Sequence, residues 1–509
     1  MTKNKQSKWV KKLKQNMYKW HRTLGIITVI PVIFWCLSGL MHPIMAHWFK
    51  PTIAHEKLEE TPLNQEQINV SIHDVLVKNS IKQFKNFRMV AFDNATYYQV
   101  KTLVANEVLY FNALDGKLLA NGDAKYAEWL SRYFIADQHS KLSSIAMQTS
   151  FDGEYKYVNR YLPIWKLNFD RNDDMDVYVE TTSSKLATYN PTSRKIQLWV
   201  FDNFHNWNFL EAITNKTLQV SVMLLLLTII GLSALSGVLI YGFFWKVFKK
   251  VPVTDNQSKF KKHHRKIGIA VSLVTFTFVF SGGYHATKKF EPYTLDKMAY
   301  APTYNTDDLV TAKALVKPDS NWANYSLIQF RNTIYLQVRL LENEDKESKN
   351  IYFDYKTAVQ KENIEIAYAT FLAEKFTKMM ATPEQEAASD CCMITNRDSA
   401  IKNAKLVETD YLYQFDNREY GFVNKRLPVI KLKYSTDDDT TIYIEPSTSR
   451  LAAFVESGDR LEGYSFAILH KFLFMDWAGK NIRDLVTALA ALGVLTVSLM
   501  GLYLFIKKK

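Results

Sequence analysis

The sequence predicts a membrane α-helical protein: four transmembrane helices form two tandem helix pairs, and an α+β domain lies between the helices of each pair. Three observations support this fold class. They are four long apolar segments, three concentrations of Lys and Arg, and a repeat that relates the two halves of the chain. A mean hydropathy of −0.18 averages these spans with two long polar segments and so hides them.

Each apolar segment is long enough to cross a bilayer, which takes about 20 mostly apolar residues in a helix. We expect the spans at 24–46, 216–244, 267–289 and 484–506. The first is longer than the apolar part of a signal peptide, and no small-residue cleavage site follows it. We therefore expect it to remain in the protein as an anchor.

The net charge of +13 is concentrated in the N-terminal segment 1–23, the loop 245–266 and the C-terminal segment 507–509. Because Lys and Arg accumulate on the cytoplasmic side of membrane proteins, these three segments are predicted to be cytoplasmic. The polar segments 47–215 and 290–483 then lie outside the cytoplasm. The basic runs lack an interleaved pattern of groove-reading aromatic residues, so we expect no nucleic-acid partner; the lipid bilayer is the expected one.

Three cysteines are few for so large an exported mass. Cys36 lies in the first span, and only Cys391 and Cys392 lie outside it. No disulfide framework is predicted. A redox or soft-metal role for the adjacent pair is an alternative to a purely structural one.

The repeat preserves histidine at both ends of the first and third spans. Residues 20–42 match residues 263–285 at a constant offset of 243, which relates His21, Arg22, Gly25, Ser38, Gly39 and His42 to His264, Arg265, Gly268, Ser281, Gly282 and His285. A helix of this length is about 31 Å long, close to the thickness of the hydrocarbon core. Each of these helices thus offers an imidazole near each membrane surface.

The exported segments repeat as well, with an offset of 265. The matches relate Asn159, Lys166, Glu180, His205 and Glu211 to Asn424, Lys431, Glu445, His470 and Asp476. The larger offset places an insertion between 286 and 419, for which 388–400 is a candidate. Alternating patterns predict hairpins at 111–122, 175–190, 351–363 and 440–455, and amphipathic patterns predict helices at 65–80, 124–137 and 364–379. Two small related domains or one pseudo-symmetric pair would fit this pattern.

With these motifs the chain resembles the PepSY-associated transmembrane family. The resemblance rests on the His-Arg-x-x-Gly openings of the first and third spans, the Ser-Gly near their outer ends, the hairpins VYVETTSSKL and IYIEPSTSRL, and a histidine before each following span. It covers nearly the whole chain. The approaches to the second and fourth spans depart from the family pattern, because no glycines follow His205 or His470.

The resemblance implies PepSY-like periplasmic domains in an inner-membrane protein that reduces ferric siderophores or other ferric chelates in iron uptake. The expected cofactor is haem b, one or two per chain, because neutral imidazole is a good axial ligand for haem iron. We expect His42 and His285 to hold an outer haem and His21 and His264 an inner one. His205 and His470 are the rivals for the outer iron, and Arg22 and Arg265 are candidates for pairing with haem propionates.

Other interpretations of these residues remain open. The histidines would also fit interfacial polar residues bonded to neighbours, and the arginines would fit positive-inside anchors. The exported domains would alternatively bind or inhibit a peptidase or sense envelope ligands, or the chain would escort iron without redox chemistry. Asn159, Asn424, Lys166 and Lys431 are candidates for substrate contacts, although structural roles are the simpler expectation.

The cytoplasmic segments are too short for a nucleotide or flavin domain, and no Gly-x-Gly-x-x-Gly motif follows a strand. A reductase of this kind would need an external electron donor, either a quinol or a cytoplasmic reductase. No hydrolase motif occurs in the sequence. Dimerisation of the chain is left open.

The predicted topology can be tested with reporter fusions. A fusion after Lys259 should report a cytoplasmic location, and a fusion after Asp307 should report the opposite side, because the concentrated Lys and Arg hold the 245–266 loop inside. The readout is alkaline phosphatase against fluorescent-protein activity. Equal signals from the two positions would contradict four spans.

Overall fold

The structure is a computed structural model that describes residues 8–250, 252–290, 298–309, 319–341, 349–380, 401, 403–416 and 419–507. The chain divides into two compact units. We call Met1–Pro51, Ser193–Pro292 and Asp459–Lys509 the helical unit, and Thr52–Thr192 with Tyr293–Gly458 the β-sheet unit. The expected insertion at 388–400 and the pair Cys391-Cys392 lie outside the described residues.

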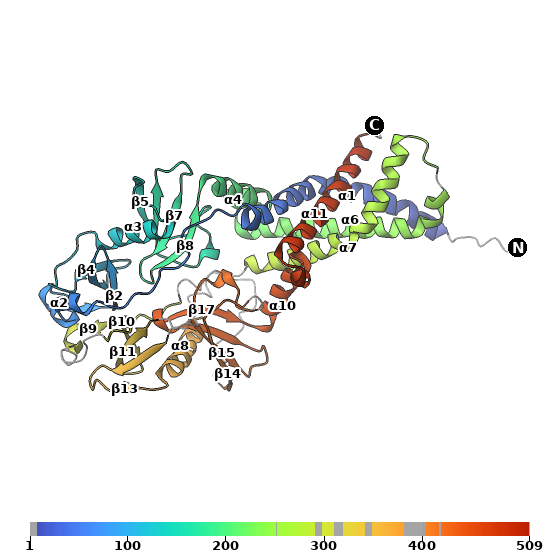
Figure 1. The fold of residues 1–509 in the computed structure, drawn as a ribbon. Helices are drawn as coiled ribbons and strands as arrows, with labels where there is room; N and C mark the ends of the chain where they lie inside the picture. Colours follow the sequence, from blue (N-terminus) through green and yellow to red (C-terminus); the bar gives the residue numbers. More distant parts are fainter. Residues whose placement is uncertain are drawn as a thin grey trace. The chain divides into compact units, whose positions relative to one another are not determined.

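Four long helices form the helical unit, and Figure 1 shows them side by side. They are α1 (Lys8–Pro43), α6 (Lys216–Lys250), α7 (Asn256–Thr287) and α11 (Lys480–Ile506). Each contains a segment long and apolar enough to cross a membrane, at Gln15–Pro43, Lys216–Lys250, Asn256–Phe290 and Lys480–Ile506. Four membrane-length helices are therefore confirmed, with α1, α6 and α7 each extending beyond the predicted span.

The bundle has the symmetry that the repeat predicts. Helix α1 packs against α6 and α11, and α7 packs against the same two helices. The repeat mates α1 and α7 thus have equivalent neighbours. Short elements complete the unit: η1 (Ile44–Trp48), α4 (Thr192–Phe204), α5 (Asn208–Ile213), η4 (Lys288–Phe290), α10 (Ser457–Ser465), η10 (Phe466–His470) and η11 (Leu473–Ala478).

These short elements group with the long helices. Residues 193–215 and 459–483, which the hydropathy pattern places in the polar segments 47–215 and 290–483, belong to the compact helical unit. The reason lies in their composition, because α4 and η10 carry aromatic side chains that pack against the ends of α1 and α7. One example is Phe204, whose ring centre lies 5.0 Å from that of Phe34 on α1.

A seven-stranded sheet joins both halves of the chain in the β-sheet unit. Its strand order is β13-β12-β11-β10-β2-β3-β4. The strands are β2 (Asn86–Phe92), β3 (Ala95–Lys101), β4 (Val108–Asn112), β10 (Trp322–Phe330), β11 (Thr333–Leu340), β12 (Asn350–Asp354) and β13 (Gln360–Lys361). The halves meet where β2 and β10 pair antiparallel, with Ser326 opposite Arg88. The polar segments 52–192 and 293–458 thus form one unit that shares a sheet.

Each half also has a four-stranded sheet of its own, covered by one helix. In the first half, β5 (Leu142–Gln148), β6 (Ile164–Phe169), β7 (Asp176–Glu180) and β8 (Lys185–Asn190) pair in that order, and α3 (Gly122–Ile135) packs on β6 and β7. In the second half, β14 (Leu406–Leu412), β15 (Val429–Tyr434), β16 (Thr441–Glu445) and β17 (Arg450–Val455) do the same, with α8 (Ile364–Met380) on top. β1 (Gln83–Phe84) and β9 (Tyr304–Asn305) form a separate short pair.

Most of the elements expected in this unit are present. The hairpins at 175–190, 351–363 and 440–455 and the helices at 124–137 and 364–379 are confirmed within a few residues. The helix expected at 65–80 is shorter, because Ser71 caps α2 (Ile72–Lys78) and a separate short turn, η2 (Gln65–Gln67), precedes it. At 111–122 the expected hairpin turn is present at Gly116, and its second arm is a single antiparallel bridge between Phe111 and Leu118, after which α3 begins.

Two asparagines hold the β2–β10 junction together. The Asn324 side chain bonds both backbone groups of Met89, at 2.8 and 3.1 Å, and the Asn86 side chain bonds both backbone groups of Leu327, at 3.1 Å each. Met89 and Leu327 are almost fully buried. These amides therefore satisfy backbone groups that have no access to water.

Replacing Asn86 by Ala should lower the stability of the β-sheet unit by about 1–3 kcal/mol, because two buried backbone groups lose their partners. Asn324→Ala should cost a similar amount, since it is the symmetric position. Thermal unfolding of the full-length protein measures both. Gln360→Ala, on an exposed edge strand, is the control; an equal loss in all three variants would contradict this role.

Candidate functional site

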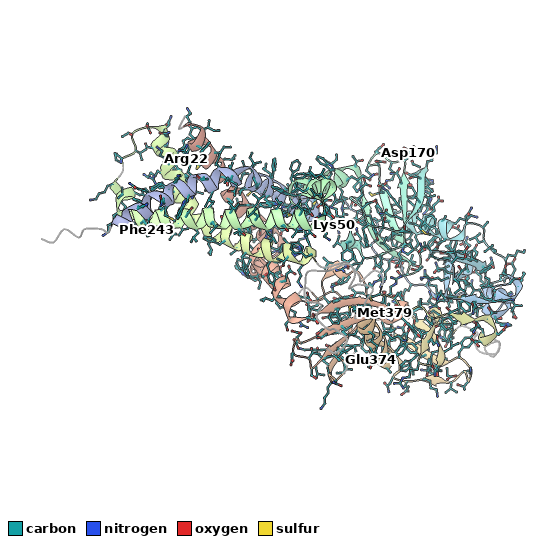
Figure 2. The ribbon with its side chains drawn as sticks, turned by 180° about the vertical axis from the view of Figure 1, so that it is seen from behind. Arg22, Lys50, Asp170, Phe243, Glu374 and Met379 are labelled. Carbon is teal, nitrogen blue, oxygen red and sulfur yellow. The ribbon has the colours of Figure 1, made fainter. Side chains whose placement is uncertain are left out.

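Two pairs of histidines face one another in the helical unit. The first pair, which we call the inner pair, consists of His21 on α1 and His264 on α7, with ring centres 6.2 Å apart and ring planes inclined by 54°. These residues are repeat mates. The neighbouring Arg22 lies toward one end of the bundle together with Phe243, whereas Lys50 lies at the other end (Figure 2).

The partners of the inner rings fix which nitrogen carries the proton. His21 Nδ1 lies 3.0 Å from the carbonyl oxygen of Ser233, and His264 Nδ1 lies 3.2 Å from the carbonyl oxygen of Val497. A carbonyl only accepts hydrogen bonds, so each Nδ1 donates a proton to it. The Nε2 lone pair of a neutral ring is then left available as a ligand.

Glycines allow the inner rings to lie against neighbouring helices. A Cβ atom on Gly237 of α6 would lie only 3.1 Å from His21 Cε1, and one on Gly501 of α11 would lie 3.5 Å from His264 Cε1. The contact at Gly237 is tighter than an ordinary one, so a side chain there would require the His21 ring to shift, whereas a Cβ at Gly501 would make an ordinary van der Waals contact. The two helix pairs therefore build the same histidine pocket twice.

The second pair, the outer pair, consists of His205 and His470. His205 follows α4 and His470 ends η10, and their ring centres are 6.5 Å apart with an interplanar angle of 87°. His205 Nδ1 lies 3.2 Å from Ser38 Oγ, and His470 Nδ1 lies 3.2 Å from Ser281 Oγ. Gly39 and Gly282 follow these serines, and a Cβ on either would lie 3.7 Å from the adjacent ring.

The serines orient the outer rings as the carbonyls orient the inner ones. Each hydroxyl donates its proton at 2.6 Å to a carbonyl of the preceding helical turn, that of Phe34 or of Thr277. Its oxygen is then an acceptor for the Nδ1–H of histidine. His205 and His470 are thus also left with Nε2 as the free donor atom. The repeated Ser-Gly dipeptides are this orienting element.

Both outer histidines are neutral at neutral pH. Burial, with a further contribution from the neighbouring His470, lowers the pKa of His205 to about 3. Burial and the neighbouring Lys471 lower the pKa of His470 to about 4. A pKa below the usual value means that the ring stays unprotonated until the solution becomes strongly acidic. A neutral imidazole is the form that binds a metal.

The spacing of both pairs suits one metal ion between two imidazoles. A metal–nitrogen bond of about 2 Å on each side holds the two ring centres roughly 6 Å apart. Each pair supplies two nitrogens, which is the number of axial ligands that six-coordinate haem iron takes, while the macrocycle supplies the other four. A structural zinc ion takes four ligands from the protein. The residues present therefore fit haem.

The structure does not bring His42 and His285 together as the expected outer pair. Among the described residues, the ring contacts of His42 and His285 are with Phe201, at 6.3 Å, and Phe466, at 4.3 Å. These phenylalanines stack in turn on His205 and His470. His285 Nδ1 also lies 2.7 Å from a Glu462 carboxylate oxygen. The expected outer ligands thus lie one aromatic ring away from the pair that does form.

Arg22 and Arg265 occupy equivalent places beside the inner pair. The Arg22 guanidinium lies 4.9 Å from the ring centre of Phe505, and that of Arg265 lies 4.3 Å from Phe248. Each arginine thus stacks on an aromatic ring of a neighbouring helix. The structure shows this cation–π contact, while pairing with a propionate remains a proposal.

The repeated polar residues of the β-sheet unit have structural roles. Lys166 forms ion pairs with Glu154 and Asp176, and Lys431 forms ion pairs with Glu408 and Asp410. Asn159 and Asn424 are buried in short turns. The simpler expectation for these residues therefore fits the structure better than substrate contact.

Sequence reasoning missed that His205 pairs with His470, although it named both. The repeat of Ser38-Gly39 as Ser281-Gly282 was a signal for this pair, because each serine contacts the Nδ1 atom of one of its histidines. His205 and His470 are 167 and 189 residues away from these serines in the sequence, and only the fold brings them close. Trp35 was also missed: its indole Nε1 donates to the backbone carbonyl of His205 at 2.8 Å and so fixes the backbone of that ligand candidate.

Comparison with known proteins finds no relative from which a function could be inferred. No protein-family model matches the chain, and no curated protein matches it either.

Proposed function

We propose that this chain is a b-type haem protein of the bacterial cytoplasmic membrane that transfers electrons outward to a ferric siderophore or other ferric chelate. The two facing histidine pairs carry the proposal. In this interpretation the chain is a member of the PepSY-associated transmembrane family, and its β-sheet unit lies in the periplasm.

The number of histidine pairs supports two haems per chain. His21 and His264 would hold one, and His205 and His470 the other. Haem iron, when bound, supplies the one-electron chemistry by changing between its ferric and ferrous states. His21 and Ser38, which orients His205, are 17 residues apart on α1, or about 25 Å along the helix. Two sites at these depths would cover most of a hydrocarbon core about 30 Å thick.

The surrounding residues suit these roles. The Nδ1 hydrogen bonds hold each ring in one orientation, which raises ligand basicity and limits rearrangement when charge changes. Arg22 and Arg265 carry guanidinium groups beside the inner pair, where they would neutralise propionate carboxylates at the cytoplasmic surface. A quinol or a cytoplasmic reductase would donate the electrons, because the chain has no nucleotide-binding motif of its own.

Reduction would release iron from a hard oxygen-donor chelate, because ferrous iron binds such ligands less strongly than ferric iron does. The activity would therefore be that of a ferric-chelate reductase. The alternatives of peptidase binding, envelope sensing and non-redox transport predict no haem in the purified protein.

His205→Ala or His470→Ala should remove the low-spin absorbance of one haem, or convert it to a high-spin spectrum, while the inner haem keeps its own. The reason is that the iron loses one of two axial imidazoles. Reduced-minus-oxidised spectra of detergent-solubilised protein measure this.

His139→Ala, on the surface of the β-sheet unit, is the control for these spectra. His42→Ala and His285→Ala should leave the low-spin signal in place, since each lies behind a phenylalanine. If these two lose the signal and the His205 and His470 variants keep it, the outer pairing proposed here is wrong.

Reduced protein should be reoxidised when a ferric chelate is added, with iron appearing in the ferrous form. Stopped-flow absorbance of dithionite-reduced protein follows the haem, and a ferrous-specific chromophore follows the iron. A chelate loaded with gallium, which is not reduced under these conditions, is the control. Haem that stays reduced with every ferric chelate, or colourless protein from haem-sufficient cells, would favour the peptidase-binding or sensing alternative.

A further inference from the structure

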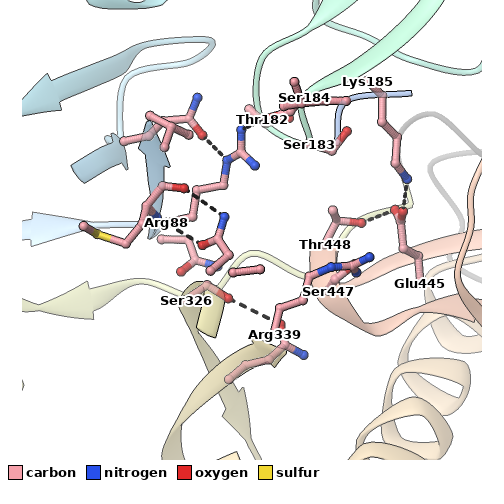
Figure 3. A pocket seen from close by; sticks show the side chains of 18 of the residues that line it. Arg88, Thr182, Ser183, Ser184, Lys185, Ser326, Arg339, Glu445, Ser447 and Thr448 are labelled. Carbon is pink, nitrogen blue, oxygen red and sulfur yellow. Dashed lines mark hydrogen bonds and ion pairs between the residues drawn. The ribbon is translucent and has the colours of Figure 1, made fainter. Parts of the chain in front are cut away.

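A cavity of about 730 Å³ lies within the β-sheet unit. None of the four paired histidines lines it. Its lining includes the β2–β10 junction and residues 182–184 and 447–449, in the turns of the two repeated hairpins. Figure 3 shows Arg88 and Arg339 near the first, and Ser183, Ser184, Ser447 and Thr448 on the turns. Cavities of this size hold small organic ligands.

The lining is rich in cations that come from equivalent places in the two halves. Lys101 and Arg339 end the matching strands β3 and β11, and Lys185 and Arg450 begin the matching strands β8 and β17. The symmetric fold thus brings four positive charges to one cavity. Lys85 and Arg88, at the start of the junction, add two more.

Two of the four symmetry-related cations, one from each half of the chain, have carboxylate partners. Arg339 pairs with Glu60, and Lys185 pairs with Glu445 (Figure 3 shows the second pair). Glu445 is buried and also bonds Arg426 at 2.8 Å. The two cations lower the pKa of Glu445 against the effect of its burial. Carboxylates of the chain itself therefore neutralise this side of the cavity.

Lys101, the symmetry mate of Arg339, has no such carboxylate partner among the described residues. Lys101 Nζ makes no hydrogen bond or ion pair with any residue that the structure describes, although its mate Arg339 does. Burial lowers the pKa of Lys101, and the nearby positive charges of Arg450 and Lys85 lower it further, with Glu180 acting in the opposite direction. An ammonium in this position would gain from an added negative charge.

The neighbouring cations have neutral partners. Lys85 donates to the carbonyl of Ala301 at 3.2 Å and to the hydroxyl of Thr303 at 2.9 Å. Arg88 donates to Gln99 Oε1, to the Thr181 carbonyl and to Ser184 Oγ. These contacts fix the two side chains in place without neutralising them. Positioned cations of this kind are typical of sites for oxygen anions.

We propose that this cavity binds a small polyanion whose charges are carried by carboxylate or phosphate oxygens, with Lys101 as its main contact. The hydroxyl groups of the two turns offer hydrogen bonds to the same ligand. The site does not depend on haem. If the chain is the ferric-chelate reductase proposed above, on which this step rests, the anion site would favour a negatively charged ferric chelate over an uncharged or cationic one.

Calorimetric titration of the full-length detergent-solubilised protein tests the proposal. The probes are citrate, ferric citrate, pyrophosphate and an uncharged ferric hydroxamate. Citrate or pyrophosphate should bind, and the stronger of the two identifies carboxylate or phosphate as the anion. Lys101→Gln should weaken binding roughly 10- to 100-fold, the effect of losing one charge-assisted hydrogen bond. Lys101→Arg should retain most of the affinity, because it keeps the charge.

Lys117→Gln is the matched control, since Lys117 lies on the surface of the same unit, outside the cavity lining, and pairs with Asp115. It should bind as the unchanged protein does. Unfolding midpoints measured for each variant separate lost binding from lost folding. The proposal is overturned if no anionic probe binds, or if a folded Lys101→Gln variant binds as tightly as the control.

The two proposals fail separately. Colourless protein that still binds citrate or pyrophosphate would remove the electron-transfer function and leave the anion site. Protein with normal haem spectra that binds none of the anions would do the reverse.

Discussion

The helical unit depends on one constraint: four neutral imidazoles must be held among apolar helices without leaving a ring nitrogen unsatisfied. A polar group without a partner in such surroundings costs several kcal/mol. The chain satisfies one of the two nitrogens of each ring, because each Nδ1 has a carbonyl or a serine oxygen as its hydrogen-bond partner. The partner ring of each pair lies 6.2 or 6.5 Å away, centre to centre, and a metal between the two rings would bind the remaining nitrogen of each.

The same constraint explains the small residues of the bundle. Gly237 and Gly501 let the inner rings approach α6 and α11, and the Ser-Gly dipeptides at 38–39 and 281–282 let the outer rings approach α1 and α7. The serine supplies the acceptor and the glycine supplies the space. Two neighbouring positions are thus enough to orient one imidazole, and the repeat uses this solution twice.

The sequence predicts the spans, the hairpins and the identity of the histidines, because hydropathy, alternation and an internal repeat are local signals. It pairs His21 with His264, as the structure does, but for the outer pair it prefers His42 and His285 to His205 and His470. His42 lies near the end of α1 and His205 lies before α6, and only the fold places His205 beside Ser38 and leaves His42 behind Phe201. The shared sheet was likewise missed, because the pairing of β2 with β10 joins residues more than two hundred positions apart.

The repeat also explains why the two units differ in symmetry. In the bundle, both halves keep the same histidines, serines and glycines, as two equal contributions to the proposed ligand pairs would require. In the β-sheet unit the halves have diverged at the axis: Arg88 faces Ser326, Lys101 corresponds to Arg339, and Glu60 neutralises only Arg339. A cavity built on a pseudo-twofold axis can lose its symmetry without losing its shape, because the strands that form it are held by the asparagine bonds at the junction. These bonds hold the strands in place although no carboxylate of the described residues neutralises Lys101, and a bound anion would offset the cost of burying its charge.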